Sequence, residues 1–274
     1  MKTMIQLAFL GVAAALAPSA NRAPRREAVS MSVDRRSALA GFGALATLAP
    51  AAASAADKKK GGKPKVVVLG GSGYVGAHVA ALLAAEGCDV VAASRASADA
   101  QAARAKTMLG GAALPPKVSF ATVDAAADDL AALLAGASAV VSCVGVVPGG
   151  KNQLNGNGAV NVRIADAAKA AGVPSFVYVS VASAISNGPG KLLFGDYVKG
   201  KAQAEAAVSR DFGASSLIIR PAIILGGPPG PPGPPGIPPV TVDAVAKTAA
   251  AGALGRKFGV LDGANEIVAA AAAL

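Results

Sequence analysis

The chain has 274 residues, enough for one α/β domain with extensions or at most two small domains. Its formal net charge of +10 lies mostly before Val66, whereas the chain from Val66 onward holds fifteen basic and thirteen acidic residues. This balance does not indicate a nucleic-acid partner, and two cysteines with one histidine exclude a disulfide framework and show no metal-ligand spacing.

Residues 1–20 have the pattern of a signal peptide. Lys2 precedes an apolar run from Met4 to Ala17, and the small residues of 18–20 follow it. The run is too short for a membrane-spanning helix, and we expect no transmembrane span in the mature chain.

Residues 21–55 predict a second targeting segment. An Arg- and Ser-rich stretch typical of a transit peptide leads to Arg35-Arg36, an apolar core and an Ala-Ser-Ala processing motif at 53–55. The series resembles leaders of proteins sent to the thylakoid lumen of plastids wrapped in extra membranes. An ordinary plastid or mitochondrial presequence is the alternative. A basic arm, residues 56–65, would then precede the folded domain.

The stretch 66–86 predicts strand, tight turn and helix. An apolar β-branched run, 66–69, enters a glycine cluster that fits G-x-G-x-x-G, and an alanine-rich helical pattern follows from Val75. Such glycines turn the chain, admit a pyrophosphate and pack the helix onto the strand, while the helix dipole favours phosphate. The residues expected to contact a dinucleotide here are Gly70, Gly71, Ser72, Gly73, Tyr74, Val75 and Gly76.

Cofactor choice depends on the end of the second predicted strand, residues 89–93. An acidic residue about 20 positions after the glycine motif would bind the ribose 2′-hydroxyl of NAD, whereas arginine suits the 2′-phosphate of NADP. Ser94 and Arg95 occupy this position, with no carboxylate beside them. NADP(H) is therefore favoured over NAD(H).

Further strands and helices alternate along the chain. This order predicts an α/β fold with a doubly wound parallel Rossmann sheet, whose ligand crevice lies at the carboxyl ends of the strands. Additional cofactor contacts are expected from Asp124, Val144, Gly145 and Pro221. The strands are predicted at 118–123, 139–145, 176–180 and 217–221, and helices at 125–134, 157–171 and 243–254.

Tyr197 and Lys201 have the i, i+4 spacing that places two side chains on one helical face. An ammonium beside a phenol would lower the phenol pKa, so that Tyr197 could exchange a proton with a carbonyl or hydroxyl. Lys201 could also hold the nicotinamide ribose. A solvated helix face is the simpler interpretation of this spacing alone.

Together, the glycine loop, Arg95, the 142–145 strand end, the Tyr197/Lys201 pair and Arg220-Pro221 resemble an atypical short-chain dehydrogenase/reductase. The resemblance covers roughly residues 65–252. Within that superfamily, the chain is most similar to the branch holding a plant plastoglobule Rossmann protein and a fungal Rossmann protein of coenzyme Q synthesis. The Rossmann accessory subunit of respiratory complex I is more distant. The resemblance implies NADP(H) binding and an association with quinone or thylakoid lipid metabolism.

Two features depart from this family. The catalytic serine should follow the fifth strand, but the position after Ser180 is apolar, which leaves Ser180 and Ser183 as the candidates and an incomplete active site as the alternative. Residues 226–239 form a Pro/Gly-rich linker where relatives carry a longer substrate-covering segment, before a C-terminal segment, 240–274, completes the 66–225 domain. The substrate and lid portion is thus reduced.

Two functions are compatible with these patterns. One is an NADP(H)-dependent oxidoreductase or isomerase of the plastid, acting on a small or lipid-like quinone, isoprenoid or pigment-related substrate. The alternative is a non-catalytic NADP(H)-bound assembly or stability factor for a membrane-associated or quinone-synthesis complex. Intact Tyr197 and Lys201 favour the first, and the apolar position after Ser180 favours the second.

Overall fold

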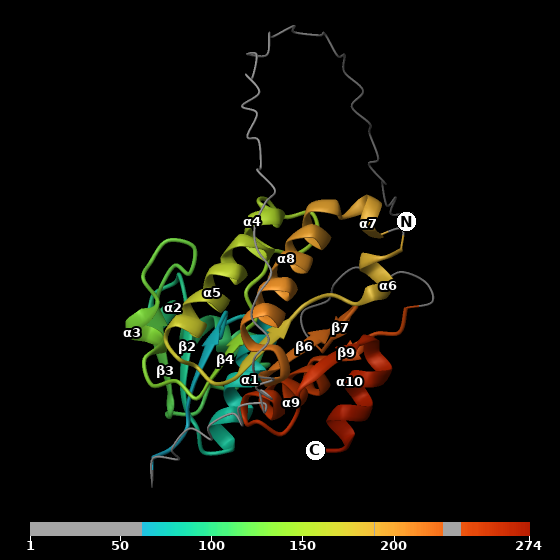
Figure 1. Ribbon diagram of the computed structural model, residues 1–274. Helices are drawn as coiled ribbons and strands as arrows, with labels where there is room; N and C mark the ends of the chain where they lie inside the picture. The colour runs from blue at the N-terminus through green and yellow to red at the C-terminus, as the bar shows by residue number, and fades with distance from the viewer. Residues whose placement is uncertain (1–61, 189, 227–236) are drawn as a thin grey trace, which may run out of the picture. The chain divides into compact units, whose positions relative to one another are not determined.

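The computed structural model describes residues 62–188, 190–226 and 237–274, and it places a seven-stranded parallel sheet between layers of helices (Figure 1). The predicted leader, the first part of the basic arm and most of the Pro/Gly-rich linker lie outside the described residues. The proposed division into segments therefore stays a prediction. The sheet strands are β1 (Lys65–Leu69), β2 (Asp89–Ser94), β3 (Val118–Thr122), β4 (Ala139–Ser142), β5 (Phe176–Val179), β6 (Ser216–Arg220) and β9 (Gly259–Asp262).

The strand order β3-β2-β1-β4-β5-β6-β9 confirms the predicted doubly wound sheet. β1 is central and pairs with both β2 and β4, so the chain reverses its direction of winding beside β1. A second, two-stranded pair joins β7 (Ile224–Leu225) to β8 (Val240–Thr241). In open parallel sheets, such a reversal point is where ligands bind.

Helices cover both faces of the sheet, and their bounds are as follows. They are α1 (Tyr74–Ala85), α2 (Ala98–Met108), α3 (Ala131–Leu134), α4 (Gln153–Asn157), α5 (Ala159–Ala170), α6 (Ser183–Ser186), α7 (Gly190–Leu193), α8 (Gly195–Phe212), the 3-10 turn η1 (Gly213–Ser215), α9 (Val242–Ala253) and α10 (Gly263–Ala272).

The central strand is apolar on both sides because each face is covered. Val66 and Val68 belong to a core beneath α1, α9 and α10, whereas Val67 and Leu69 belong to a core beneath α3, α5 and α8. All four side chains are at most 1 % exposed. A continuous β-branched run is the pattern expected of a parallel strand buried on both faces.

Two predicted helices were too long. Between 125 and 134, only α3 is helical, because the carboxylate of Asp124 accepts the N–H of Ala126 and that of Asp129 accepts the N–H of Ala131. Short carboxylate side chains commonly replace helical backbone bonds in this way. The predicted helix 157–171 shortens to α5, because Gly158, with φ −97° and ψ −84°, separates α5 from α4, which ends at Asn157.

The C-terminal residues complete the sheet. β9 pairs in parallel with β6 as the edge strand, which was not predicted, and α10 follows it with Ile267 fully buried. Within the described ranges, no helix combines the length and apolar character that crossing a membrane requires.

Candidate functional site

Two adjoining cavities open at the carboxyl ends of the central strands. The first, of about 380 Å³, lies between the glycine loop and the ends of β2, β3 and β4. The second, of about 240 Å³, lies between the start of α1, the ends of β4 and β5, and α8. Gly73, Cys143, Gly145 and Val146 line both cavities, so the two form one continuous cleft.

The glycine loop needs its glycines for steric reasons. Gly70 has φ +77°, a region that residues with a Cβ rarely adopt. A Cβ on Gly71 would lie 2.7 Å from the Cβ of Ala92, and one on Gly76 would lie 2.2 Å from the carbonyl oxygen of Gly70. The loop therefore brings its backbone closer to β2 and to itself than any other residue type would allow.

The N-terminus of α1 points its first-turn N–H groups toward this cleft. Gly73 is the N-cap, and no side chain caps the helix there. The first N–H groups of a helix have no intrahelical partner and carry its positive dipole end, which suits a phosphate. A glycine cradle that a Cβ would fill, next to an uncapped twelve-residue helix, fits the pyrophosphate of a dinucleotide.

Basic and acidic side chains line the far end of the first cavity. Ser94 is the last residue of β2, Arg95 follows it, and Asp124 comes after β3, as the chain order predicted. Arg104, on α2, lines the same cavity and was missed, because the sequence analysis assigned no helix to residues 98–108. Both arginines are exposed, so two guanidinium groups border this end of the cleft.

Val144 and Gly145 line the cleft after β4, and two buried asparagines hold this segment. The amide oxygen of Asn157 accepts the N–H of Val146 at 3.1 Å, and its nitrogen donates to the carbonyl of Val146 at 2.9 Å. Asn161 donates to the carbonyl of Val144 at 3.2 Å. No role was predicted for Asn157 or Asn161 from the sequence; in the structure they fix the backbone beside the cleft.

Lys201 lies almost wholly inside the protein, with 6 % of its surface exposed. Its Nζ donates to the carbonyl of Val179 at 2.9 Å and lies 5.0 Å from the ring centre of Tyr178. Burial lowers the pKa of Lys201 from 10.5 to about 8. The ammonium therefore sits at the wall of the second cavity, held by backbone at the end of β5.

Tyr197 lines the same cavity one helical turn before Lys201, with its ring centre 5.9 Å from Nζ. The expected lowering of its pKa was wrong: burial raises the pKa of Tyr197 to about 12. The ammonium faces the ring and bonds to a carbonyl, and it does not approach the phenol closely enough to offset desolvation. The phenol stays protonated at neutral pH.

The two candidate serines have different surroundings. Ser180 lines the second cavity with Tyr197 and Lys201; it is 4 % exposed, and its Oγ is buried without a hydrogen-bond partner. Ser183 lines neither cavity, because its hydroxyl and N–H both donate to the carboxylate of Asp262. A catalytic role for Ser183 therefore does not fit the structure, whereas Ser180 is placed beside Tyr197.

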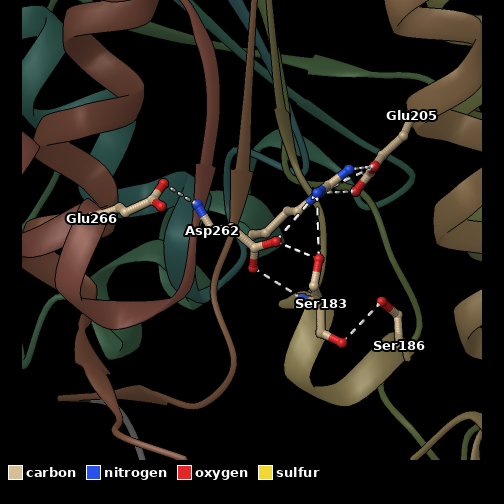
Figure 2. Close-up of polar contacts among 6 residues, drawn as sticks. Ser183, Ser186, Glu205, Asp262 and Glu266 are labelled. Atoms are coloured by element: carbon tan, nitrogen blue, oxygen red, sulfur yellow. Dashed lines mark hydrogen bonds and ion pairs between the residues drawn. The ribbon is translucent and has the colours of Figure 1, made fainter. Parts of the chain in front are cut away.

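Ser183 instead belongs to a polar network at the ends of β5, β6 and β9 (Figure 2). Arg220 donates to both carboxylate oxygens of Glu205, at 3.0 and 2.5 Å, and to Asp262 at 3.2 Å. Glu205 lies on α8, one turn beyond Lys201. The network thus links the helix that carries Tyr197 to the segment that follows Ser180.

Most of the predicted site residues meet in this cleft, although their assigned roles stay predictions. The first cavity is lined by Gly70, Ser72, Gly73, Ser94, Arg95, Asp124, Val144 and Gly145, and the second by Gly73, Tyr74, Val75, Gly76, Gly145, Ser180, Tyr197, Lys201 and Pro221. Gly71 and Ser183 line neither. No cluster of three or more potential metal-ligating side chains occurs in the described part of the chain.

Comparisons with known proteins agree with this architecture. A model of an NAD(P)H-binding family matches residues 70–251. An uncharacterized chloroplastic protein of Arabidopsis thaliana is 33% identical over 162 residues, which is 59% of this chain and 51% of the relative. The matching region thus spans about half the length of that protein.

Solved structures share the fold. The oxidoreductase ylbE of Lactococcus lactis is 20% identical with a TM-score of 0.56, over 77% of this chain and 96% of that one. The UDP-glucuronic acid 4-epimerase of Bacillus cereus, in complex with NAD, is 18% identical with a TM-score of 0.54, over 72% of this chain and 77% of that one. At such identities the likeness concerns the fold alone.

Proposed function

Because this chain belongs to the NAD(P)H-binding family, with a Rossmann domain of the atypical short-chain dehydrogenase/reductase and epimerase type, we propose that it is an NADP(H)-dependent oxidoreductase or isomerase of the plastid. The observation that carries the proposal is the meeting of Ser180, Tyr197 and Lys201 in the cavity adjoining the glycine loop. Membership of the branch that holds the plant plastoglobule and fungal coenzyme Q synthesis Rossmann proteins is part of this proposal.

The preference for NADP(H) over NAD(H) rests on Arg95 and Arg104. Both border the cavity end where β2 stops, and both are exposed and able to reach a charged ligand. Guanidinium groups bind phosphate through paired hydrogen bonds, whereas a ribose 2′-hydroxyl favours a carboxylate partner. Asp124 also lines this cavity, but it follows β3, and its Oδ1 accepts the N–H of Ala126 at 3.0 Å.

The reaction would use the protonated phenol of Tyr197. A nicotinamide, when bound in this cleft, supplies or accepts a hydride. Tyr197 would give a proton to the substrate oxygen, which its pKa of about 12 allows at neutral pH. Ser180 would donate a hydrogen bond to the same oxygen through its partnerless Oγ, and Lys201 would contribute a positive charge to the cavity wall, 5.9 Å from the ring centre of Tyr197.

The second cavity favours an apolar carbonyl compound. Besides the reactive groups, its wall contains Val146, Val147, Ala222 and Ile224. We therefore assign a quinone, an isoprenoid or a pigment-related molecule as the substrate class. The chloroplastic relative and the leader pattern support a plastid location, with the thylakoid lumen as the destination and the mitochondrion as the alternative.

The reaction is tested by NADPH oxidation in the presence of short-chain quinones and isoprenoid aldehydes. Tyr197→Phe should lower kcat by about a thousandfold, within the range that general acids contribute, while the Kd for NADPH stays within twofold. An unchanged rate in this variant would remove Tyr197 from the mechanism. Identification of the N-terminal peptide of the native protein tests the location.

Cofactor choice has a separate test. Arg95→Asp and Arg104→Gln should each weaken NADPH binding at least tenfold and leave NADH binding within about twofold, since only NADPH carries the 2′-phosphate. Lys106→Gln, an exposed charge change on the same helix α2, serves as the control. Equal weakening of both cofactors would contradict the assignment.

A non-catalytic NADP(H)-bound assembly or stability factor is the second candidate, acting with a membrane-associated complex. It is favoured by Val181, a buried apolar residue at the position after Ser180, where the family resemblance predicts the catalytic serine. In that case no acceptor would support turnover, yet NADPH would raise the melting temperature, and Tyr197→Phe would not reduce that increase.

A further inference from the structure

Large apolar side chains protrude around the second cavity. Leu192 is 93 % exposed and Val147 is 74 % exposed, the two highest values among the exposed large apolar residues of the described chain. Leu225, beside the cavity residue Ile224, is 50 % exposed. Isolated exposed apolar residues are common, but protruding side chains on segments next to a mostly apolar cavity point to an interaction site.

Leu192 and Val147 come from different segments at the same end of the sheet. Val147 lines the second cavity and follows β4. Leu192 lies on α7, which packs against α6 and α8, and Tyr197 in the first turns of α8 lines the same cavity. Figure 1 shows α4, α7 and the start of α8 together at one end of the domain.

Exposed lysines accompany these side chains. Lys151 follows Val147, Lys191 precedes Leu192, and Lys199 lies on the first turns of α8; all three are exposed. Asp196 is the exposed acidic residue of these segments, residues 145–152 and 183–199 as far as they are described. We call Val147, Lys151, Lys191, Leu192 and Lys199 the mouth surface. It carries a local positive excess, although the chain from Val66 onward is nearly balanced.

We propose that the mouth surface docks on an anionic lipid bilayer. Protruding aliphatic side chains next to lysines are the composition of interfacial membrane contacts, where the apolar groups enter the acyl boundary and the ammonium groups meet lipid phosphates. Protein interfaces are instead enriched in arginine and aromatic residues and depleted of lysine. Among the described residues of these segments, no exposed side chain is an arginine or an aromatic ring.

Docking in this orientation turns the second cavity toward the lipid. An apolar molecule dissolved in the bilayer would then enter past Val147 without crossing water. Docking depends on surface residues and not on the reaction, so it requires neither turnover nor a particular cofactor.

Fluorescence at single sites of the full chain tests the proposal. Leu192→Cys and, as a matched control, Phe258→Cys are labelled with an environment-sensitive maleimide dye. Phe258 is a 43 % exposed apolar residue beside the edge strand β9. Burial raises the pKa of each of the two native cysteines, Cys88 and Cys143, which slows their reaction with the dye at neutral pH. Vesicles contain phosphatidylcholine alone or with 30% phosphatidylglycerol.

With anionic vesicles, the dye at position 192 should shift to the blue and be quenched by nitroxide-labelled lipid, whereas the dye at 258 should not respond. Lys191→Glu with Lys199→Glu should weaken the position-192 response by at least about fivefold per lysine. The N-terminal region is the same in all variants, so binding through it alone would leave position 192 silent and overturn the proposal. A blue shift of the dye at position 192 that depends on protein concentration in the absence of vesicles would assign the surface to a second copy of the chain. Equal responses to vesicles at 192 and 258 would refute the docking orientation.

Discussion

Removing the guanidinium of Arg220 should destabilise the domain strongly, although Arg220 is the last residue of strand β6. Arg220→Met keeps most of the side-chain volume but leaves two carboxylates without their shared cation. In the folded protein, Arg220 contacts Glu205 through three hydrogen bonds of 2.5 to 3.2 Å and Asp262 through one of 3.2 Å (Figure 2). The side chains of Arg220 and Asp262 are each 28 % exposed, and that of Glu205 is 15 % exposed.

The expected loss follows from this partial burial. Breaking a fully buried ion pair from one side costs about 3 to 5 kcal/mol, and exposed pairs contribute about 0 to 1 kcal/mol. With roughly three quarters of the groups covered, Arg220→Met should lower the free energy of unfolding by about 2 to 3 kcal/mol. In a domain of this size, that corresponds to a fall in Tm of roughly 4 to 12 °C.

Equilibrium urea unfolding of the full chain measures the loss, with Arg256→Met as the matched control. Arg256 pairs with Glu86 at 2.7 Å, but these side chains are 54 and 44 % exposed, so little stability should depend on them. If the two variants lose equal stability, or if Arg220→Met loses less than about 1 kcal/mol, the network does not hold β6, β9 and α8 together as argued.

Three further outcomes are expected. Gly76→Ala places a methyl carbon 2.2 Å from the Gly70 carbonyl oxygen, which should distort the glycine loop. Calorimetry should show that NADPH binding is weakened at least tenfold, and the free energy of unfolding should fall by about 1 to 3 kcal/mol. Normal binding would contradict the close approach. Burial lowers the pKa of Lys201 from 10.5 to about 8, so the folded state binds fewer protons than the unfolded state between these pH values. In urea titrations, the stability of the wild type relative to Lys201→Met should therefore rise with pH across this window. Burial acts to raise the pKa of Asp262, but hydrogen bonds from Ser183 and Arg220 outweigh burial and lower this pKa. The wild type should therefore be more stable than Asp262→Asn above pH 3.8 and lose this advantage on acidification below it.

Much of the site could be predicted because short-range patterns determine it. The glycine spacing after β1, the arginine after β2 and the Tyr197/Lys201 pair each depend on residues within one or two turns of chain. The doubly wound order of strands then places these segments along one edge of the sheet. For these features, residue spacing and the order of strands along the chain were sufficient to predict which residues line the cleft.

The remaining features depend on contacts between distant segments. Arg104 reaches the cleft only because α2 runs back beside β3. Position 158 requires glycine because α8 passes so close that a Cβ would lie 3.0 Å from the Cα of Gly200. The direction of the Tyr197 pKa shift depends on how Lys201 is oriented and how deeply both are buried. Spacing along the chain does not specify these relationships.

The position of β9 at the edge of the sheet has a consequence for synthesis. β6 pairs with β9, whose first residue, Gly259, lies about forty residues later in the chain, and this pairing covers the backbone edge of a strand whose residues Leu217 to Ile219 are almost completely buried. While the C-terminal residues are still in the ribosome, β6 is an open apolar edge that can pair with other chains. The nascent protein is therefore prone to aggregate until β9 emerges and pairs with β6, and we expect truncation before Gly259 to yield insoluble protein.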